Sequence, residues 1–317
     1  MMLHGKAVVI TGAGRGIGAA CARGAAGQGA RVVVNDVDAD PAAETVEAIR
    51  AAGGEAISCV ADVSDWEDAG RLIGTCIDTF GRIDGLVNNA ALYQRAPIEA
   101  FDPQVARALV EVNVLGPLHC TARAVKPMLA QGSGSIVQVT SGAHMGIAGL
   151  GIYGATKGAI ASMLYCWSLE LAGTGVRMNA ISPFGLTDIA INSARQINRR
   201  FNSDYPEEQT PPGLQIQPPE ANSPVVEYLL SDAADWVHGQ VVRIDNGELQ
   251  LCTHPAQLLP SVVRDEWTAA AVAQAFDAEL RDRLIPCGVM GMECLPIDLK
   301  SGFWQRPGAP DLANSVD

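Results

Sequence analysis

Short apolar runs rich in Val and Ile alternate along the chain with longer segments in which apolar residues recur at helical spacing. The short runs predict seven β-strands, at 7–11, 31–35, 56–60, 85–88, 135–140, 176–181 and 240–245. Helical segments near 41–52, 65–80, 103–130, 154–172 and 222–231 separate most of them. Apolar strands that alternate with helices are typical of a parallel sheet covered on both faces. We therefore predict an α/β, doubly wound fold with a seven-stranded, mostly parallel sheet.

The first predicted strand runs directly into a glycine-rich segment, TGAGRGIG, at 11–18. Glycines at a turn from strand to helix let the backbone approach a pyrophosphate, whose charge the helix N-terminus favours. The second predicted strand is followed by Asp36, 20 residues after Gly16. A carboxylate there accepts hydrogen bonds from an adenosine ribose and repels a 2′-phosphate, and no Lys or Arg follows it directly. The segment predicts a Rossmann-type dinucleotide site that prefers NAD over NADP.

A Ser, a Tyr and a Lys follow the fifth predicted strand. Tyr153 and Lys157 are four residues apart in YGATKGAIASMLYCWSLEL, so both project from one face of the predicted helix. A tyrosine with an ordinary pKa of about 10 is a poor base at neutral pH, but an ammonium group and a helix N-terminus both favour its phenolate. The segment predicts proton transfer to and from a hydroxyl group, although a surface Tyr–Lys pair would give the same spacing.

Together these segments resemble the classical short-chain dehydrogenase/reductase family over roughly residues 5–247. TGAGRGIG resembles its dinucleotide loop, CVADVSD its adenine-side segment, LVNNAA its NNAG segment, and NAISPFGLT its stretch over the nicotinamide. The resemblance implies that an NAD cofactor is contacted by Gly12, Gly14, Arg15, Gly16, Ile17, Gly18, Asp36, Asp62, Val63, Asn89, Ala90, Tyr153, Lys157, Pro183, Leu186 and Thr187.

The resemblance also assigns four catalytic residues, which are Asn113, Ser141, Tyr153 and Lys157. It implies that Tyr153, as a phenolate, takes the proton of an alcohol whose hydride passes to NAD, and that Lys157 lowers the tyrosine pKa and hydrogen-bonds the nicotinamide ribose. Ser141 would stabilise the substrate oxygen. Asn113, in VEVNVLGP, would hold a water that passes the proton to solvent.

Three positions depart from the family pattern. Ala91 replaces the usual glycine of NNAG, and Phe184 follows Pro183 where a glycine is usual. The spacing from Ser141 to Tyr153 is one residue shorter than usual, so Thr140 is the alternative source of the catalytic hydroxyl.

The predicted function is that of an NAD-dependent short-chain alcohol dehydrogenase or ketoreductase acting on a bulky hydrophobic secondary alcohol or its ketone, such as a hydroxysteroid or a terpenoid. The candidate pocket residues are mostly apolar, and they are Tyr93, His144, Met145, Ile147, Leu150, Phe184 and Leu186. Ordinary core packing is the alternative for each. Two other functions remain open: a 3-hydroxyacyl-CoA or 3-oxoacyl-thioester oxidoreductase, and, more remotely, a non-catalytic NAD-binding sensor or scaffold.

The charge balance of 22 Lys and Arg against 35 Asp and Glu gives a net charge of −13. This charge argues against nucleic acid or an anionic membrane as a partner. Apolar runs of membrane-spanning length and a signal peptide pattern are both missing from the sequence, so we expect a cytoplasmic protein. The eight cysteines lack C-x-x-C spacing and the five histidines form no ligand pair, which predicts buried free thiols and no metal site.

We expect one catalytic domain at 1–250, with its polar, proline-rich segment 186–221 as a substrate lid or, alternatively, a surface excursion. The extension 251–317 includes an amphipathic segment at 267–284 and is expected to pack on the core or on a neighbouring subunit. The helices predicted at 103–130 and 154–172 carry further apolar residues that predict a subunit interface, at Leu109, Val110, Leu118, Met163, Trp167 and Leu171. The resemblance implies a homodimer or homotetramer.

Overall fold

The computed structural model describes residues 1–183, 217–245, 247–255 and 260–283. The chain divides into two compact units, Met1–Cys252 and Thr253–Asp317. Three predicted site residues, Phe184, Leu186 and Thr187, lie outside the described residues, as does most of the predicted lid.

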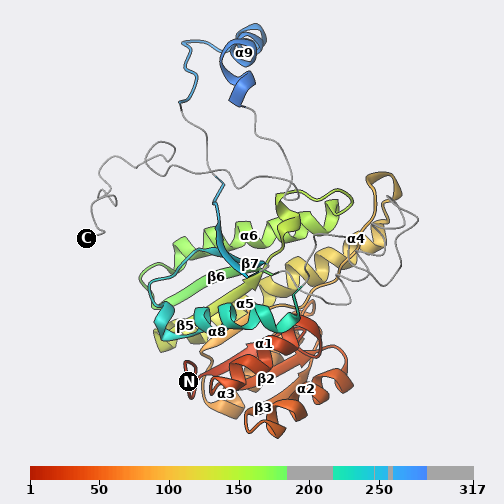
Figure 1. The fold of residues 1–317 in the computed structure, drawn as a ribbon, viewed down its shortest axis with the longest axis vertical. Helices are drawn as coiled ribbons and strands as arrows, with labels where there is room; N and C mark the ends of the chain where they lie inside the picture. The colour runs from red at the N-terminus through yellow and green to blue at the C-terminus, as the bar shows by residue number, and fades with distance from the viewer. Residues whose placement is uncertain (184–216, 246, 256–259, 284–317) are drawn as a thin grey trace. The chain divides into compact units, whose positions relative to one another are not determined.

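The first unit is built on one eight-stranded sheet with the order β3-β2-β1-β4-β5-β6-β7-β8 (Figure 1). Its strands are β1 (Ala7–Ile10), β2 (Arg31–Asp36), β3 (Glu55–Val60), β4 (Gly85–Asn88), β5 (Gly134–Val139), β6 (Val176–Pro183), β7 (Val241–Asp245) and β8 (Glu248–Cys252). The first seven are parallel and correspond to the seven predicted strands, whereas β8 pairs antiparallel with β7. The doubly wound α/β fold is confirmed.

The predicted strand count of seven is wrong by one, because β8 was not recognised. Leu249 and Leu251 are 68% and 67% exposed, so this edge strand lacks the apolar run that marked the buried strands. β8 also runs across the predicted boundary at 250–251, since Leu251 and Cys252 pair with Val242 and Val241.

The helices lie on both faces of the sheet (Figure 1). They are α1 (Gly16–Gly27), α2 (Ala39–Ala51), α3 (Trp66–Phe80), α4 (Pro103–Val110), α5 (Gly116–Gln131), α6 (Gly151–Leu171) and α8 (Ser223–Leu230). A π-helical turn, Glu111–Leu115, separates α4 from α5 in the segment that was predicted as one helix. Pro117 lacks the N–H that an uninterrupted α-helix would donate to the carbonyl of Asn113, which accounts for the interruption.

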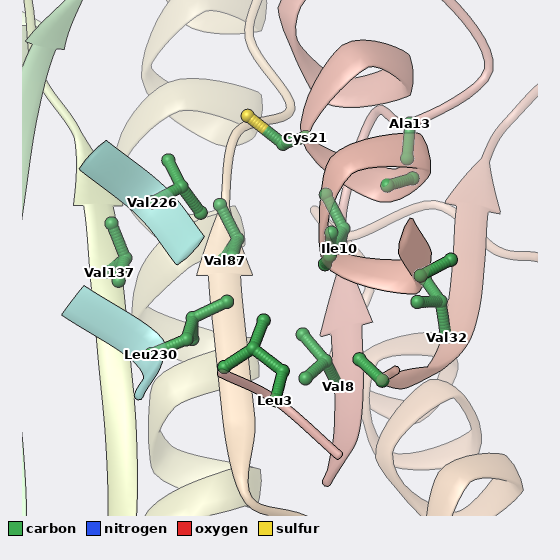
Figure 2. Packing of buried hydrophobic residues seen from close by; sticks show 14 of the residues in the cluster. Leu3, Val8, Ile10, Ala13, Cys21, Val32, Val87, Val137, Val226 and Leu230 are labelled. Carbon is green, nitrogen blue, oxygen red and sulfur yellow. The ribbon is translucent and has the colours of Figure 1, made fainter. Parts of the chain in front are cut away.

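Alternation along the strands divides the core into two clusters. In β1, Val8 and Ile10 face α1 and α8, and Figure 2 shows them packed with Val226 and Leu230 of α8. Val9, on the opposite face, belongs to a second cluster with residues of α3, α5 and α6. Because the sheet is buried on both faces, the carboxyl ends of its strands are left as the edge where loops can form a site.

Two of the predicted interface residues belong to the core. Leu109 and Leu171 are 1% and 6% exposed, so they are not available to a partner subunit, contrary to the sequence-based expectation. Val110 is 44% exposed, and Leu118, Met163 and Trp167 are partly buried. Helical spacing alone did not separate inward from outward apolar positions, because α6 is apolar around most of its circumference.

Cys21, Cys59, Cys76 and Cys120 are buried free thiols. Burial raises the pKa of Cys21, Cys76 and Cys120 to about 12, so these groups stay protonated and pack as small apolar side chains. Within the described part of the chain, no helix has both the length and the apolar character needed to cross a membrane.

The second unit has short helical segments in its described part, α9 (Ala269–Ala275), a π-helical turn at Phe276–Leu280 and a 3-10 turn at Arg281–Arg283. Thr268 caps α9 by accepting a hydrogen bond from the Ala271 N–H at 3.1 Å.

Candidate active site

The glycine-rich loop joins β1 to α1 and is tied to the end of β4. Thr11 Oγ1 accepts hydrogen bonds from the N–H groups of Asn89 and Ala90, both at 3.0 Å. The Asn89 amide donates to the carbonyls of Thr11 and Gly12, both at 2.9 Å. Since β2 lies on one side of β1 and β4 on the other, the loop sits where the strand order reverses, which is where open α/β sheets bind ligands.

Two glycines of the loop are packed too closely to carry a side chain. Gly12 has φ +58°, and a Cβ there would lie 2.7 Å from the Ala90 Cα. A Cβ on Gly18 would overlap the Gly12 carbonyl oxygen and lie 2.5 Å from the Asn89 Nδ2. The N-terminus of α1 has no side-chain cap and no acidic residue in its first turn. Close-packed glycines at an uncapped helix N-terminus fit a pyrophosphate.

Asp36 ends β2 beside this loop. Its Oδ2 accepts a hydrogen bond from the Gly14 N–H at 3.0 Å, and its Oδ1 accepts one from the Asp38 N–H at 3.2 Å. Arg15 is the cation of the loop, and its guanidinium pairs with the Asp38 carboxylate at 2.6 Å. The position suited to a ribose diol therefore carries negative charge, while the neighbouring cation is held by a second carboxylate.

Asp62 and Val63 follow β3, one strand beyond Asp36. The Asp62 carboxylate accepts hydrogen bonds from the N–H and the hydroxyl of Ser64, at 2.9 and 2.7 Å. Val63 is 4% exposed and packs against Gly116, where a Cβ would lie 2.8 Å from its Cγ2. Asp62 and Val63 therefore lie past the carboxyl end of β3, on the same edge of the sheet as the dinucleotide loop.

Tyr153 lies in the first turn of α6, and the side chain of Ser141 is near enough to act on the pKa of its hydroxyl. The turn that follows Ser141 comes close to the helix because Gly154 has no side chain: a Cβ there would lie 2.6 Å from the Ala143 carbonyl oxygen. Thr140 instead donates its hydroxyl proton to the Ile181 carbonyl in β6, at 3.2 Å. The structure therefore brings Ser141, and not Thr140, to Tyr153.

Lys157 lies one turn after Tyr153 on the same helix, α6. Its Nζ is 5.8 Å from the centre of the Tyr153 ring and donates a hydrogen bond to the Val139 carbonyl at 2.8 Å. The side chain is buried, and burial lowers the pKa of Lys157 to about 8.

The Tyr153 hydroxyl holds its proton more tightly than the sequence predicted. Burial raises the pKa of Tyr153 to about 12, and the nearby Tyr93 adds to the increase, although the side chain of Ser141 works in the opposite direction. The lowered pKa that the sequence predicted for Tyr153 is therefore not found, because desolvation of the phenolate is the largest influence on this group.

Asn113 connects the loop after β4 to α6. Its Oδ1 accepts a hydrogen bond from the Leu92 N–H at 2.7 Å, and its Nδ2 donates to the Leu92 carbonyl at 2.9 Å and to the Thr156 hydroxyl at 3.1 Å. The next residue, Tyr93, contacts Tyr153 edge to face with ring centres 4.9 Å apart. A fully buried Asn113 thus positions the loop whose Tyr93 contacts Tyr153.

The other candidate pocket residues are distributed differently. The His144 ring bonds to the Ser141 carbonyl, Met145 is 38% exposed and Leu150 is 5% exposed. A pocket of about 560 Å³ lies between the segments 94–102 and 147–152, and of the described candidates only Ile147 belongs to its lining. The segment 94–102 was not recognised from the sequence, because a loop with only a short 3-10 turn has no periodicity to recognise.

Comparisons with known proteins agree with this geometry. A family model described as short chain dehydrogenase matches residues 6–198. A 3-oxoacyl-[acyl-carrier-protein] reductase of Synechocystis is 36% identical over 77% of this chain and 97% of its own. A cis-4-hydroxycyclohexanecarboxylate dehydrogenase of Sinomonas cyclohexanicum is 34% identical over 76% of this chain and 96% of its own. The crystal structure of a short chain dehydrogenase from Mycobacterium avium superposes with a TM-score of 0.78 and 30% identity, covering 92% of this chain and all of the other.

The matched residues include the glycine loop, Asp36, Asn113 and the Ser141–Tyr153–Lys157 group. The chain therefore belongs to the short-chain dehydrogenase/reductase family of oxidoreductases, which use the nicotinamide cofactors NAD(P).

Proposed function

We propose that this protein is an NAD-dependent dehydrogenase or ketoreductase that interconverts a bulky hydrophobic secondary alcohol and its ketone. The observation that carries the proposal is the grouping of three side chains: Ser141 acts on the Tyr153 hydroxyl, and the Lys157 Nζ lies 5.8 Å from the centre of the Tyr153 ring. The Sinomonas relative, whose name describes an alcohol on a cyclohexane ring, supports a substrate of this kind.

In the proposed reaction, bound NAD supplies the hydride chemistry at the carbon that carries the oxygen. Ser141 holds the substrate oxygen, and Tyr153 gives the proton to a ketone or takes it from an alcohol. The raised pKa of Tyr153, about 12, keeps the proton on the hydroxyl at neutral pH, which favours its role as an acid in ketone reduction. Lys157 supplies a positive charge near the tyrosine and the ribose.

Asn113 holds the loop of Tyr93 in place through its contacts with Leu92 and Thr156, and we retain the expectation that it also supports proton release to solvent. Asp36 selects NAD by accepting hydrogen bonds from the ribose diol. We further propose a cytoplasmic homo-oligomer, dimer or tetramer, in which 186–221 forms a lid and the extension 251–317 packs on the core or a neighbouring subunit.

A 3-oxoacyl-thioester oxidoreductase is the second candidate, because the Synechocystis relative is 36% identical and its name describes that reaction. The two functions differ in the group attached beyond the reacting carbon. A thioester substrate carries a long phosphopantetheine arm, whereas a cyclic alcohol is enclosed by the pocket alone.

Assays of the purified protein distinguish these candidates. NADH absorbance is followed with cyclic secondary alcohols plus NAD, with the matching ketones plus NADH, and with 3-oxoacyl-CoA plus NADH. Preferred turnover of the cyclic compounds supports the proposal. Preferred turnover of the thioester assigns the second function, and no turnover of any of them contradicts both.

A further inference from the structure

The pocket beside the catalytic group is largely apolar. Its volume, about 560 Å³, lies in the range of small-molecule sites. Much of its wall comes from Ala96, Pro97, Ile98, Phe101, Ile147 and Ile152. A wall of this composition suits a hydrocarbon ring or chain. A charged side chain is unusual in such a lining.

Arg95 is the one cationic side chain among the lining residues, all of which the structure describes. Its Nε is buried and has no hydrogen-bond partner. Gly149, with φ +80°, leaves space for the arginine stem: a Cβ there would lie 3.3 Å from the Arg95 Cγ. The Ala96 N–H donates to the Gly149 carbonyl at 2.9 Å, which joins the two walls of the pocket beside the guanidinium.

The acidic residues of the lining do not neutralise Arg95. The Asp102 carboxylate accepts hydrogen bonds from the N–H groups of Gln104 and Val105 at the start of α4. Glu99 is exposed, and no described carboxylate forms an ion pair with Arg95. The buried Nε–H has lost its hydration without compensation, and the charge of the Arg95 guanidinium is not balanced by any described carboxylate of the lining.

The pocket adjoins the reacting group through two stretches of chain. Tyr93, which contacts the Tyr153 ring, is two residues before Arg95. Gly151 and Ile152, which line the pocket, directly precede Tyr153 in α6. The pocket lining therefore includes the chain neighbours of both tyrosines.

We propose that the substrates of this enzyme carry a carboxylate distant from the reacting carbon, and that Arg95 binds this carboxylate. The inference rests on the proposed alcohol–ketone function and narrows its substrate class to hydrophobic hydroxy acids and keto acids. The planar guanidinium matches a carboxylate with two parallel hydrogen bonds, which an ester or amide of the same acid cannot reproduce.

Matched pairs of ketones test the proposal on the purified full-length protein. The probes are 4-oxocyclohexanecarboxylate and 4-acetylbenzoate, each compared with its methyl ester, in NADH-dependent reduction and in calorimetric binding. The variants are Arg95→Met, Arg95→Lys and the control Arg107→Met, which removes an exposed arginine of α4 outside the pocket lining.

We expect the wild type to prefer each acid over its ester, and Arg95→Met to lower kcat/KM for the acids roughly 10- to 100-fold, mainly through KM. The esters should change less than about threefold, Arg95→Lys should recover part of the preference, and Arg107→Met should match the wild type. Equal binding of acid and ester by the wild type, or equal losses for both in Arg95→Met, overturns the proposal.

The binding measurement separates this inference from the proposed function. Acid binding that depends on Arg95, without reduction of any ketone, would leave the carboxylate site standing and contradict the alcohol–ketone function. Reduction of acids and esters with equal efficiency, unaffected by Arg95→Met, would leave the function standing and contradict the carboxylate site.

Discussion

At the scale of single residues, Asp36 and Arg15 bear on the choice between NAD and NADP. Tyr153 and Lys157 bear on the pH dependence of proton transfer in the proposed reaction. Asp36 already accepts a hydrogen bond from Gly14, and Arg15 is paired with Asp38. A 2′-phosphate at the end of β2 would therefore meet a carboxylate while the loop's own cation is engaged elsewhere. Sequence reasoning identified Asp36, but the Arg15–Asp38 pair depends on how α1 and α2 meet the sheet and has no local sequence signal.

The first prediction concerns cofactor choice. The wild type should use NAD more efficiently than NADP by about 100-fold or more in kcat/KM, because the 2′-phosphate faces like charge. Asp36→Ser should lower the efficiency with NAD roughly 10-fold and raise that with NADP. Asp40→Ser, at an exposed position in the first turn of α2, is the control and should change neither. Equal use of both cofactors by the wild type would contradict the assignment of Asp36.

The pH dependence of ketone reduction follows from Tyr153 and Lys157. Tyr153 must be protonated to act as an acid, and its pKa of about 12 keeps it so through the accessible range. Burial lowers the pKa of Lys157 to about 8, so its positive charge is present below that pH and lost above it. We expect kcat for reduction at saturating NADH to be level near pH 6–7 and to fall above about pH 8. A plateau that continues to about pH 10 would show that the Lys157 charge is not needed.

At the scale of elements, the sequence predicts a strand or helix where apolar residues recur in a regular pattern. The seven parallel strands were predicted within a few residues because each is an apolar run, and the glycine loop was identified by its spacing. The π-turn around Asn113 was missed because apolar spacing continues through it. β8 and the pocket loop 94–102 were missed because one is an exposed edge and the other is irregular.

The two ends of α1 offer a matched pair of glycine substitutions. Gly18→Ala places a Cβ against the Gly12 carbonyl and Asn89, so it should lower the free energy of unfolding by about 2 kcal/mol and weaken NAD binding at least about 10-fold. Gly27→Ala, at the other end of the same helix, meets no atom within 4 Å and should be neutral or stabilising by up to about 1 kcal/mol. Urea unfolding and NAD titration measure both effects. If the two variants behave alike, the close packing of the loop does not matter.

At the scale of the whole molecule, the first unit contains its own core. Every residue of the two core clusters precedes Thr253, and the sheet ends with β8 at Cys252. The role of the second unit stays a prediction: its apolar residues, including Trp267 and Phe276, indicate that it packs against protein surface.

Truncation tests that role. A chain ending at Cys252 keeps β8 intact, whereas one ending at Gln250 would remove its pairing with Val241 and Val242. We expect the 1–252 chain to fold and bind NAD with unchanged affinity, but to show a higher KM for ketone, a lower Tm or a smaller oligomer mass. Calorimetry, light scattering and steady-state kinetics measure these properties. If all three equal those of the full chain, the second unit neither closes the pocket nor joins subunits.

The central claim is that the Tyr153 hydroxyl transfers the proton of the reaction. Tyr153→Phe keeps the ring that packs against Tyr93 and removes the group that meets Ser141. The most direct measurement is kcat of this variant, with NAD affinity and Tm measured on the same preparation and Tyr165→Phe, in the same helix, as the control. We predict a loss of about 10²- to 10⁴-fold in kcat, with NAD affinity within a few-fold of wild type and an unchanged control. Residual turnover within about 10-fold of wild type would contradict the account.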